Sequence, residues 1–148
     1  MELRNHSTSL NTSTVGIDEG SEKMFDHEKL DVYRVSLDFT AWAYRICKNL
    51  KGVNRNTRDQ MLRASQSIPQ NIAEGNGKRS GPDRRRFFEI ARGSALECAS
   101  ILDILISCEI LRKDEVSTGK EALLRIVAML SKMTEIPDKI REEDLEYR

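Results

Sequence analysis

The sequence predicts an all-helical protein, an antiparallel up-down-up-down four-helix bundle. Only three of the 148 residues are proline and only 5% are aromatic, whereas a β-sandwich would need frequent turn signals and many strand-forming residues. Charged residues make up 32% of the chain and alternate with apolar residues at helical spacings of three and four. The segments between these patterns are short, so we expect sequential helices to be antiparallel neighbours.

Composition divides the chain into three parts. Residues 1–28 hold two Lys/Arg against six Asp/Glu, and we expect a polar, acidic extension that is disordered over 1–23. Residues 29–133 hold nineteen against twelve and form the predicted bundle domain. Residues 134–148 hold three against six and form an acidic tail. A basic domain between acidic ends suits a polyanionic partner, or ends that shield the domain from one.

The first predicted helix spans residues 29–50 and carries two adjacent apolar stripes. One stripe consists of Tyr33, Leu37 and Tyr44, and the other of Val35, Phe39, Trp42, Ile46 and Leu50. One stripe is enough for a helix in an isolated bundle, so the second indicates a wider buried face and hints at a partner subunit.

The second predicted helix opens with Thr57 and Gln60 in capping-box spacing and ends at Gly75 or Gly77. Pro69 lies inside it and removes the backbone donor that would serve the carbonyl of Ser65. We expect a kink there, with a water or a hydroxyl such as that of Ser65 itself satisfying the carbonyl. The alternative is a break into two short helices.

The third helix is predicted to start with Ser80 or Gly81 as its cap, with Pro82 at the first position and Asp83 near the positive end. Its expected inner face is Phe87, Ala91, Ser94, Cys98, Ile101, Leu105 and Cys108. Small residues, Gly93 among them, would let a neighbouring backbone approach, which suggests a central helix. The fourth helix is expected over residues 114–133.

The sequence lacks the residue patterns that metal-binding, redox, histidine-based catalytic and membrane-spanning proteins need. The three cysteines have no CxxC spacing and sit among apolar neighbours, so we expect buried free thiols without a metal or redox role. The two histidines, His6 and His27, precede the predicted bundle, which excludes a histidine-based catalytic site in its core. No apolar run reaches the ~18–20 residues that span a bilayer, and no signal-peptide pattern opens the chain. We therefore expect a cytoplasmic protein without a membrane partner, metal or cofactor.

A glycine-punctuated basic segment is the best candidate for a binding site. It contains Lys78, Arg79, Arg84, Arg85 and Arg86, with Asp83 as the one acidic residue. A phosphate-binding Walker loop is excluded, because Ile72 stands where its first glycine would be and Arg79 where its hydroxyl residue would be. The cluster suits contact with a nucleic-acid backbone, and the alternative is a solvated surface paired with Glu89 or with another chain. The three consecutive arginines fan around ~200° of helix, so they cannot all face one ligand.

Asn71 and Glu74 lie one turn apart on the second helix. An acid–base role for them lacks a second carboxylate, a histidine and a nucleophile. We expect instead that Glu74 pairs with Arg92 or Arg86 of the next helix and fixes the corner between them.

The residues of this region resemble a known family, the four-helix bundle proteins encoded in intervening sequences of bacterial 23S rRNA genes. The family has an S-I-P-x-N-I-A-E-G stretch, then a basic residue, then F-x-x-x-A-x-G-S-x-x-E. Here the first motif begins at Ser67 and includes Pro69, Asn71, Glu74 and Gly75, the basic residues are Lys78 and Arg79, and the second motif begins at Phe87 and includes Gly93, Ser94 and Glu97.

The resemblance spans roughly residues 29–133 and implies a homopentameric ring without enzymatic activity. It also implies a relation to the accessory protein of diversity-generating retroelements, a basic pentamer that works with nucleic acid. We therefore expect a non-enzymatic homo-oligomer that binds structured RNA or DNA through its basic surface. The alternative is a protein-interaction scaffold whose basic patch meets an acidic protein partner.

Overall fold

The computed structural model describes residues 22–135, and within them all regular structure is helical. The four long helices are α1 (Asp31–Cys47), α2 (Arg55–Gly77), α3 (Gly81–Ser107) and α4 (Lys113–Thr134). Two short 3-10 helices, η1 (Asp26–Lys29) and η2 (Gly52–Asn54), precede α1 and α2. The predicted all-helical class and the four helices are confirmed. The disorder expected over 1–23 lies outside the described residues except at 22–23. The acidic tail expected over 134–148 lies outside them except at Thr134, which ends α4, and Glu135.

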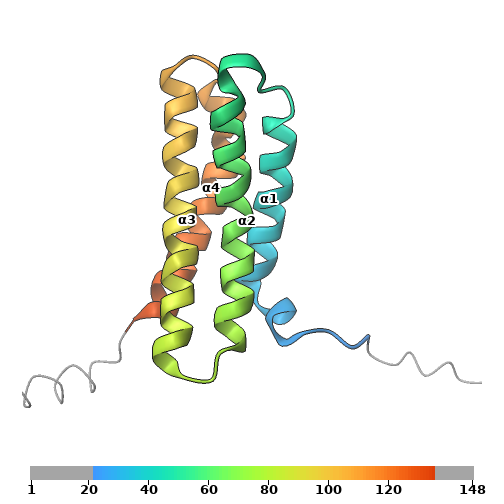
Figure 1. Cartoon of the computed structure of the whole chain (residues 1–148), viewed down its shortest axis with the longest axis vertical. Coiled ribbons are helices and arrows are strands. Elements are labelled where there is room, and N and C mark those ends of the chain that lie inside the picture. The colour runs from blue at the N-terminus through green and yellow to red at the C-terminus, as the bar shows by residue number, and fades with distance from the viewer. Residues whose placement is uncertain (1–21, 136–148) are drawn as a thin grey trace, which may run out of the picture.

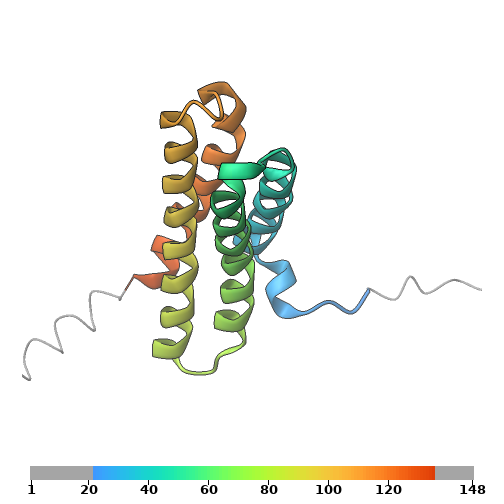
Figure 2. The same cartoon turned by 45° about the horizontal axis from the view of Figure 1, so that its top comes forward.

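The four helices stand side by side with their long axes nearly aligned (Figures 1 and 2). Helix α1 packs against α2 and α4, and α3 packs against the same two neighbours, so no described helix lies at the centre. The expectation of a central third helix was therefore wrong. The α1–α2 and α3–α4 connections lie at one end of the bundle and the α2–α3 connection at the other (Figure 1).

The core fills the space between the four helices. Its largest fully buried side chains come from every long helix and include Phe39, Met61, Leu102 and Leu130. Three serines, Ser36, Ser65 and Ser94, are the buried polar residues of the described part, and each has a hydrogen-bond partner. The core is therefore satisfied without a charged group inside it.

The two apolar stripes of α1 differ in burial. Phe39 and Leu50 of the second stripe are buried, and its other three members are partly buried against the core. In the first stripe, Leu37 and Tyr44 are 44% and 49% exposed. The chain's own core therefore covers the second stripe and Tyr33 of the first, whereas Leu37 and Tyr44 lie on the surface.

Helix α2 continues through Pro69 from Arg55 to Gly77, so the alternative of two short helices was wrong. The hydroxyl of Thr40 on α1 lies 3.0 Å from the carbonyl oxygen of Ser65, whereas the Ser65 hydroxyl donates to the carbonyl of Leu62. The predicted use of a hydroxyl is thus confirmed, but it comes from the neighbouring helix.

The ends of the helices depart from the sequence patterns in two places. Helix α2 begins at Arg55, directly after η2, and not at a Thr57 cap. Cys108 is exposed at the end of α3, so the prediction that all three thiols are buried was wrong for this one. The chain turns there, with Glu109 at a φ of 57°.

The predicted Ser80 cap of α3 is confirmed, because the Ser80 hydroxyl accepts a hydrogen bond from the backbone N–H of Asp83 at 3.2 Å.

Candidate nucleic-acid interface

The α2–α3 corner, residues 75–88, positions the basic cluster by a close contact between two helices. Gly75 is buried near the end of α2, and a Cβ added there would lie 2.9 Å from the Phe88 ring on α3. Phe88 is itself 3% exposed. The missing side chain at Gly75 therefore lets the start of α3 press against the end of α2, which fixes where the basic residues stand.

Arg84 links the start of α3 to the end of α2. Its guanidinium donates to the carbonyl oxygen of Asn76 at 2.7 Å and to that of Lys78 at 3.3 Å. It also stacks near the Phe88 ring, 5.7 Å from its centroid. Carbonyl oxygens at a helix C-terminus lack intrahelical donors. Arg84 therefore donates hydrogen bonds to backbone carbonyls at the end of α2 that would otherwise be unpaired. Its contact with a nucleic acid stays a prediction, and its structural role is clear.

Three other cations of the cluster are exposed, and two of them lie against the Phe87 ring. Lys78, Arg79 and Arg86 are all exposed, and Arg85 is half-buried. The Lys78 ammonium lies 5.0 Å from the Phe87 ring centroid and the Arg86 guanidinium 5.8 Å from it. The ring thus draws two cations to one place, which concentrates positive charge around an aromatic side chain. Within residues 22–135 none of these four residues forms an ion pair with a carboxylate, so the expected pairing with Glu89 is not formed.

The remaining motif residues form a hydrogen-bonded contact between α2 and α3. The Asn71 amide donates to the Ser67 carbonyl at 2.7 Å and to the Ser67 hydroxyl at 3.0 Å. The Ser67 hydroxyl lies 2.8 Å from that of Ser94 on α3. These three polar side chains satisfy one another between the helices, so Asn71 and Ser94 have structural roles here.

Glu74 does not pair with Arg92 or Arg86, so that prediction was wrong. Glu74 is exposed, whereas the Arg92 guanidinium donates to the Ser131 hydroxyl on α4 at 2.9 Å. Arg92 therefore lies on the side of α3 that faces α4, and the Arg86 guanidinium lies against Phe87. Glu97 is also exposed, and neither carboxylate has an ion-pair partner among the described residues.

Gly93 lies on the exposed side of α3, and a Cβ added there would meet no atom within 4 Å. The backbone approach that we expected at Gly93 is therefore not made within the chain. An exposed glycine inside a helix costs roughly 0.5–1 kcal/mol relative to alanine. The fold of a single chain gives no reason for glycine at this position.

The described part of the chain has no cluster of metal ligands, and its two core thiols are unreactive. No group of three or more His, Cys, Asp or Glu within residues 22–135 is placed to hold a metal ion. Burial raises the pKa of the Cys47 thiol to about 11 and that of Cys98 to about 12. Both thiols are therefore protonated near neutral pH and are poor nucleophiles. Among the helices of residues 22–135, none is long and apolar enough to cross a membrane.

Sequence reasoning missed two features of this region. It did not find that Arg84 serves the carbonyls at the end of α2, although arginine a few residues after a helix end is a usable signal. It also did not find the Thr40–Ser65 contact, because no local pattern links residues 25 positions apart.

Comparison with known proteins places the chain in a family. A comparison with curated proteins found no match. A solved structure of a Bacteroides thetaiotaomicron protein of unknown function, from the S23 ribosomal protein family, is similar with a TM-score of 0.65 and 26% identity. The match covers 71% of this chain and 99% of that one. The family model described as 23S rRNA-intervening sequence protein matches residues 28–132. The chain therefore belongs to the 23S rRNA-intervening sequence protein family, as the resemblance of its motifs predicted.

Proposed function

We propose that this protein is a non-enzymatic, homo-oligomeric up-down-up-down bundle that binds structured RNA or DNA through the α2–α3 corner. The observation that carries the binding proposal is the set of cations at that corner without carboxylate partners in the described chain. Lys78, Arg79 and Arg86 are exposed, and two of them flank the Phe87 ring. The phosphate oxygens of a nucleic acid would supply the negative charge that these cations have no partner for. The aromatic ring suits stacking with an unpaired base.

Assembly into a ring, which we propose to be a homopentamer, is supported by two unlike apolar surfaces. Leu37 and Tyr44 are exposed on α1, and Ile90 and Ile104 are exposed on α3. Helices α1 and α3 do not pack against each other, so these surfaces lie on different sides of the bundle. A contact between unlike surfaces joins copies head to tail, and such contacts close into rings when the rotation allows.

The exposed motif residues on α3 support the same assembly. Gly93 and Glu97 lie on the outer side of α3, and Glu74 is exposed on the adjacent α2. Open space at Gly93 admits a neighbouring helix, and the two carboxylates suit arginines of a second copy. A ring would also repeat the α2–α3 corner on every subunit, so weak phosphate contacts would add by avidity.

The binding proposal is tested by titrating structured RNA, single-stranded RNA and duplex DNA at low and physiological salt. The variant is Lys78/Arg79/Arg86→Glu, which spares Arg84 because that residue holds the corner. The control is Lys113/Arg125/Lys132→Glu, which makes the same change in charge at exposed positions of α4, a helix that does not pack against α2. We expect binding that weakens steeply with salt in wild type and control, and is lost in the variant.

A protein-interaction scaffold is the second candidate, favoured by large exposed apolar residues on α3 and α4. Ile104 is 51% exposed and Leu124 is 71% exposed, and large exposed apolar side chains suit a protein partner. An acidic protein would then occupy the α2–α3 corner. Wild-type protein that binds no nucleic acid at low salt, and that co-purifies with one defined acidic protein, would favour this candidate over the first.

A further inference from the structure

The opposite end of the bundle carries a second concentration of positive charge. Residues 45–58, which we call the α1–α2 corner, contain five cations and no Asp or Glu. The cations are Arg45, Lys48, Lys51, Arg55 and Arg58. This is a higher ratio of basic to acidic residues than at the α2–α3 corner, where Asp83 interrupts the cluster.

The middle three of these cations lie on the short turn between α1 and α2. Helix α1 ends at Cys47, η2 follows with Gly52 at a φ of 61°, and α2 begins at Arg55. A φ in this region is readily adopted by glycine, and it lets the chain reverse within a few residues. Lys48, Lys51 and Arg55 are all exposed on this turn.

These three cations lack partners, whereas Arg58 does not. The Arg58 guanidinium lies 3.1 Å from the Asp59 carboxylate and 3.4 Å from the Leu50 carbonyl oxygen. Within residues 22–135 no carboxylate comes within ion-pair distance of Lys48, Lys51 or Arg55. Arg58 therefore has a structural role, and the other three leave their charge uncompensated.

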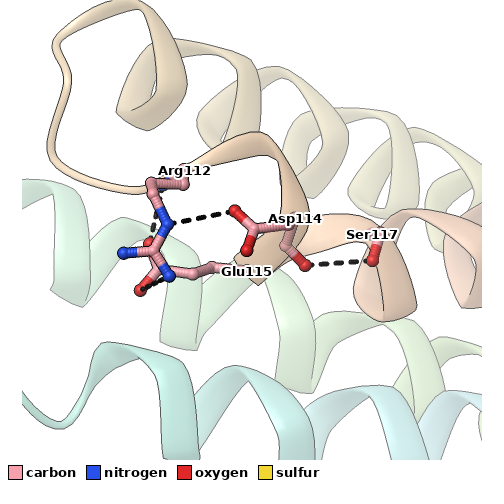
Figure 3. Close-up of polar contacts among 4 residues, drawn as sticks. All are labelled: Arg112, Asp114, Glu115 and Ser117. Carbon is pink, nitrogen blue, oxygen red and sulfur yellow. Dashed lines mark hydrogen bonds and ion pairs between the residues drawn. The ribbon is translucent and has the colours of Figure 1, made fainter.

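The neighbouring α3–α4 corner, at the same end of the bundle, is built differently (Figures 1 and 3). There Arg112 pairs with Asp114 at 3.1 Å and with Glu115 at 3.8 Å. The hydrogen bond from Arg112 lowers the pKa of the Asp114 carboxyl. Arg112 is thus neutralised within its own loop, and positive charge stays concentrated at the α1–α2 corner.

The fold itself explains only one of the three free cations. Lys48 follows the C-terminus of α1, where a positive charge stabilises a helix by roughly 0.3–1 kcal/mol. Arg55 is the first residue of α2, where the helix dipole disfavours a positive charge. Lys51 precedes η2 and contacts no acidic residue of the described chain. An external anion would relieve the repulsion among all three.

We propose that the α1–α2 corner, through Lys48, Lys51 and Arg55, is a second surface that binds the phosphate backbone of a nucleic acid. The partner class rests on the proposed function, but the surface is separate from the α2–α3 corner. Helix α2 joins the two corners and has 23 residues, hence a length of about 35 Å. That length corresponds to roughly ten base pairs of duplex at about 3.4 Å each.

The spacing makes binding depend on the length of the nucleic acid. A duplex of about 8 base pairs reaches one corner, and one of about 24 base pairs reaches both. Binding at the second corner is then intramolecular and raises the overall affinity. Loss of either corner should therefore weaken the long duplex much more than the short one.

The test measures fluorescence anisotropy of labelled duplexes of both lengths over a range of salt. The variants are Lys48/Lys51/Arg55→Glu, Lys78/Arg79/Arg86→Glu and their combination, with Lys113/Arg125/Lys132→Glu on α4 as the control of equal charge change. We expect the first variant to bind the long duplex about tenfold or more weakly, with a salt slope lower by about 2–3. We expect it to bind the short duplex within about twofold of wild type, and the combination to bind neither.

The outcomes separate this inference from the proposed function. If Lys48/Lys51/Arg55→Glu binds like the control while Lys78/Arg79/Arg86→Glu loses binding, the second surface is overturned and the proposed function stands. If only the α1–α2 variant loses binding, the second surface stands and the α2–α3 surface fails. If wild type binds no duplex at low salt, the second surface is overturned, and the titration with structured and single-stranded RNA decides the proposed function separately. Circular dichroism checks folding, and Lys48/Lys51/Arg55→Gln replaces any variant that fails to fold.

Discussion

The hydroxyl of Thr40 on α1 lies 3.0 Å from the carbonyl oxygen of Ser65 on α2, the carbonyl that Pro69 leaves without its usual backbone donor. The same hydroxyl is 2.9 Å from the carbonyl oxygen of Ser36, so one proton serves two acceptors. A proline inside a helix costs about 3 kcal/mol or more, in part through the lost hydrogen bond. A side chain from the neighbouring helix offsets part of that cost and ties α1 to α2.

Replacing Thr40 with valine should therefore destabilise the fold. Valine keeps the shape of threonine but removes the hydroxyl that donates to the Ser65 carbonyl, and an unsatisfied polar group costs about 1–3 kcal/mol. Urea denaturation should show a lower free energy of unfolding for Thr40→Val, whereas Thr40→Ser keeps the hydroxyl and should lose less. Equal stability of Thr40→Val and wild type would show that the contact contributes nothing.

Gly75 and Gly77 form a matched pair near the end of α2. An alanine Cβ at Gly75 would lie 2.9 Å from the Phe88 ring, whereas one at Gly77 would meet no atom within 4 Å. We expect Gly75→Ala to destabilise the protein by about 1–3 kcal/mol through overpacking. We expect Gly77→Ala to be neutral or stabilising by up to about 1 kcal/mol. Thermal unfolding of both variants measures the difference, and a stabilised Gly75→Ala would contradict the close contact.

Gly93→Ala should have opposite effects on the stability of the single chain and on its assembly into a ring. In a single chain the substitution meets open space and should stabilise α3 by about 0.5–1 kcal/mol. In the proposed ring a neighbouring helix lies against this position, so the added methyl should weaken assembly. Light scattering should give five times the chain mass of 16.9 kDa for wild type and a smaller mass for the variant at equal concentration. If wild type has the mass of a single chain, the proposed ring is wrong.

The cysteines should differ in reactivity. Cys108 is exposed, whereas Cys47 and Cys98 are 1% and 0% exposed. A thiol reagent at neutral pH should modify one cysteine quickly in the native protein and all three after denaturation. Rapid reaction of all three in native protein would contradict the burial of the core thiols, and Cys108→Ser should remove the fast phase.

The same thiols should make the fold sensitive to alkali. Burial raises the pKa of Cys47 from 9.0 to about 11 and that of Cys98 from 9.0 to about 12. Above pH 9 the unfolded chain loses these protons before the folded chain does, so the free energy of unfolding falls between pH 9 and the folded pKa values and levels off above them. The loss is about 1.4 kcal/mol per pH unit for each thiol. Cys98→Ala should show a shallower fall between pH 9 and about 12 in urea denaturation.

Local patterns in the sequence determined the four helices and most of their inner faces. Apolar residues at spacings of three and four, the Ser80 cap and the short connections are all local signals, and the structure confirms the helices that they predict. The paired motifs around Ser67 and Phe87 also identified the family without any coordinates. These features follow from the sequence because helix formation and capping depend on residues within a turn or two of one another.

Contacts between helices were decided only by the tertiary structure. The donor for the Ser65 carbonyl comes from Thr40, Glu74 has no arginine partner among the described residues, and Arg84 serves the end of α2. Each depends on how far a helix is rotated about its axis, and one residue changes that direction by ~100°. The sequence by itself therefore determined which segments are helical and which residues are charged. Only packing decided which charges the fold neutralises and which it leaves exposed for a partner.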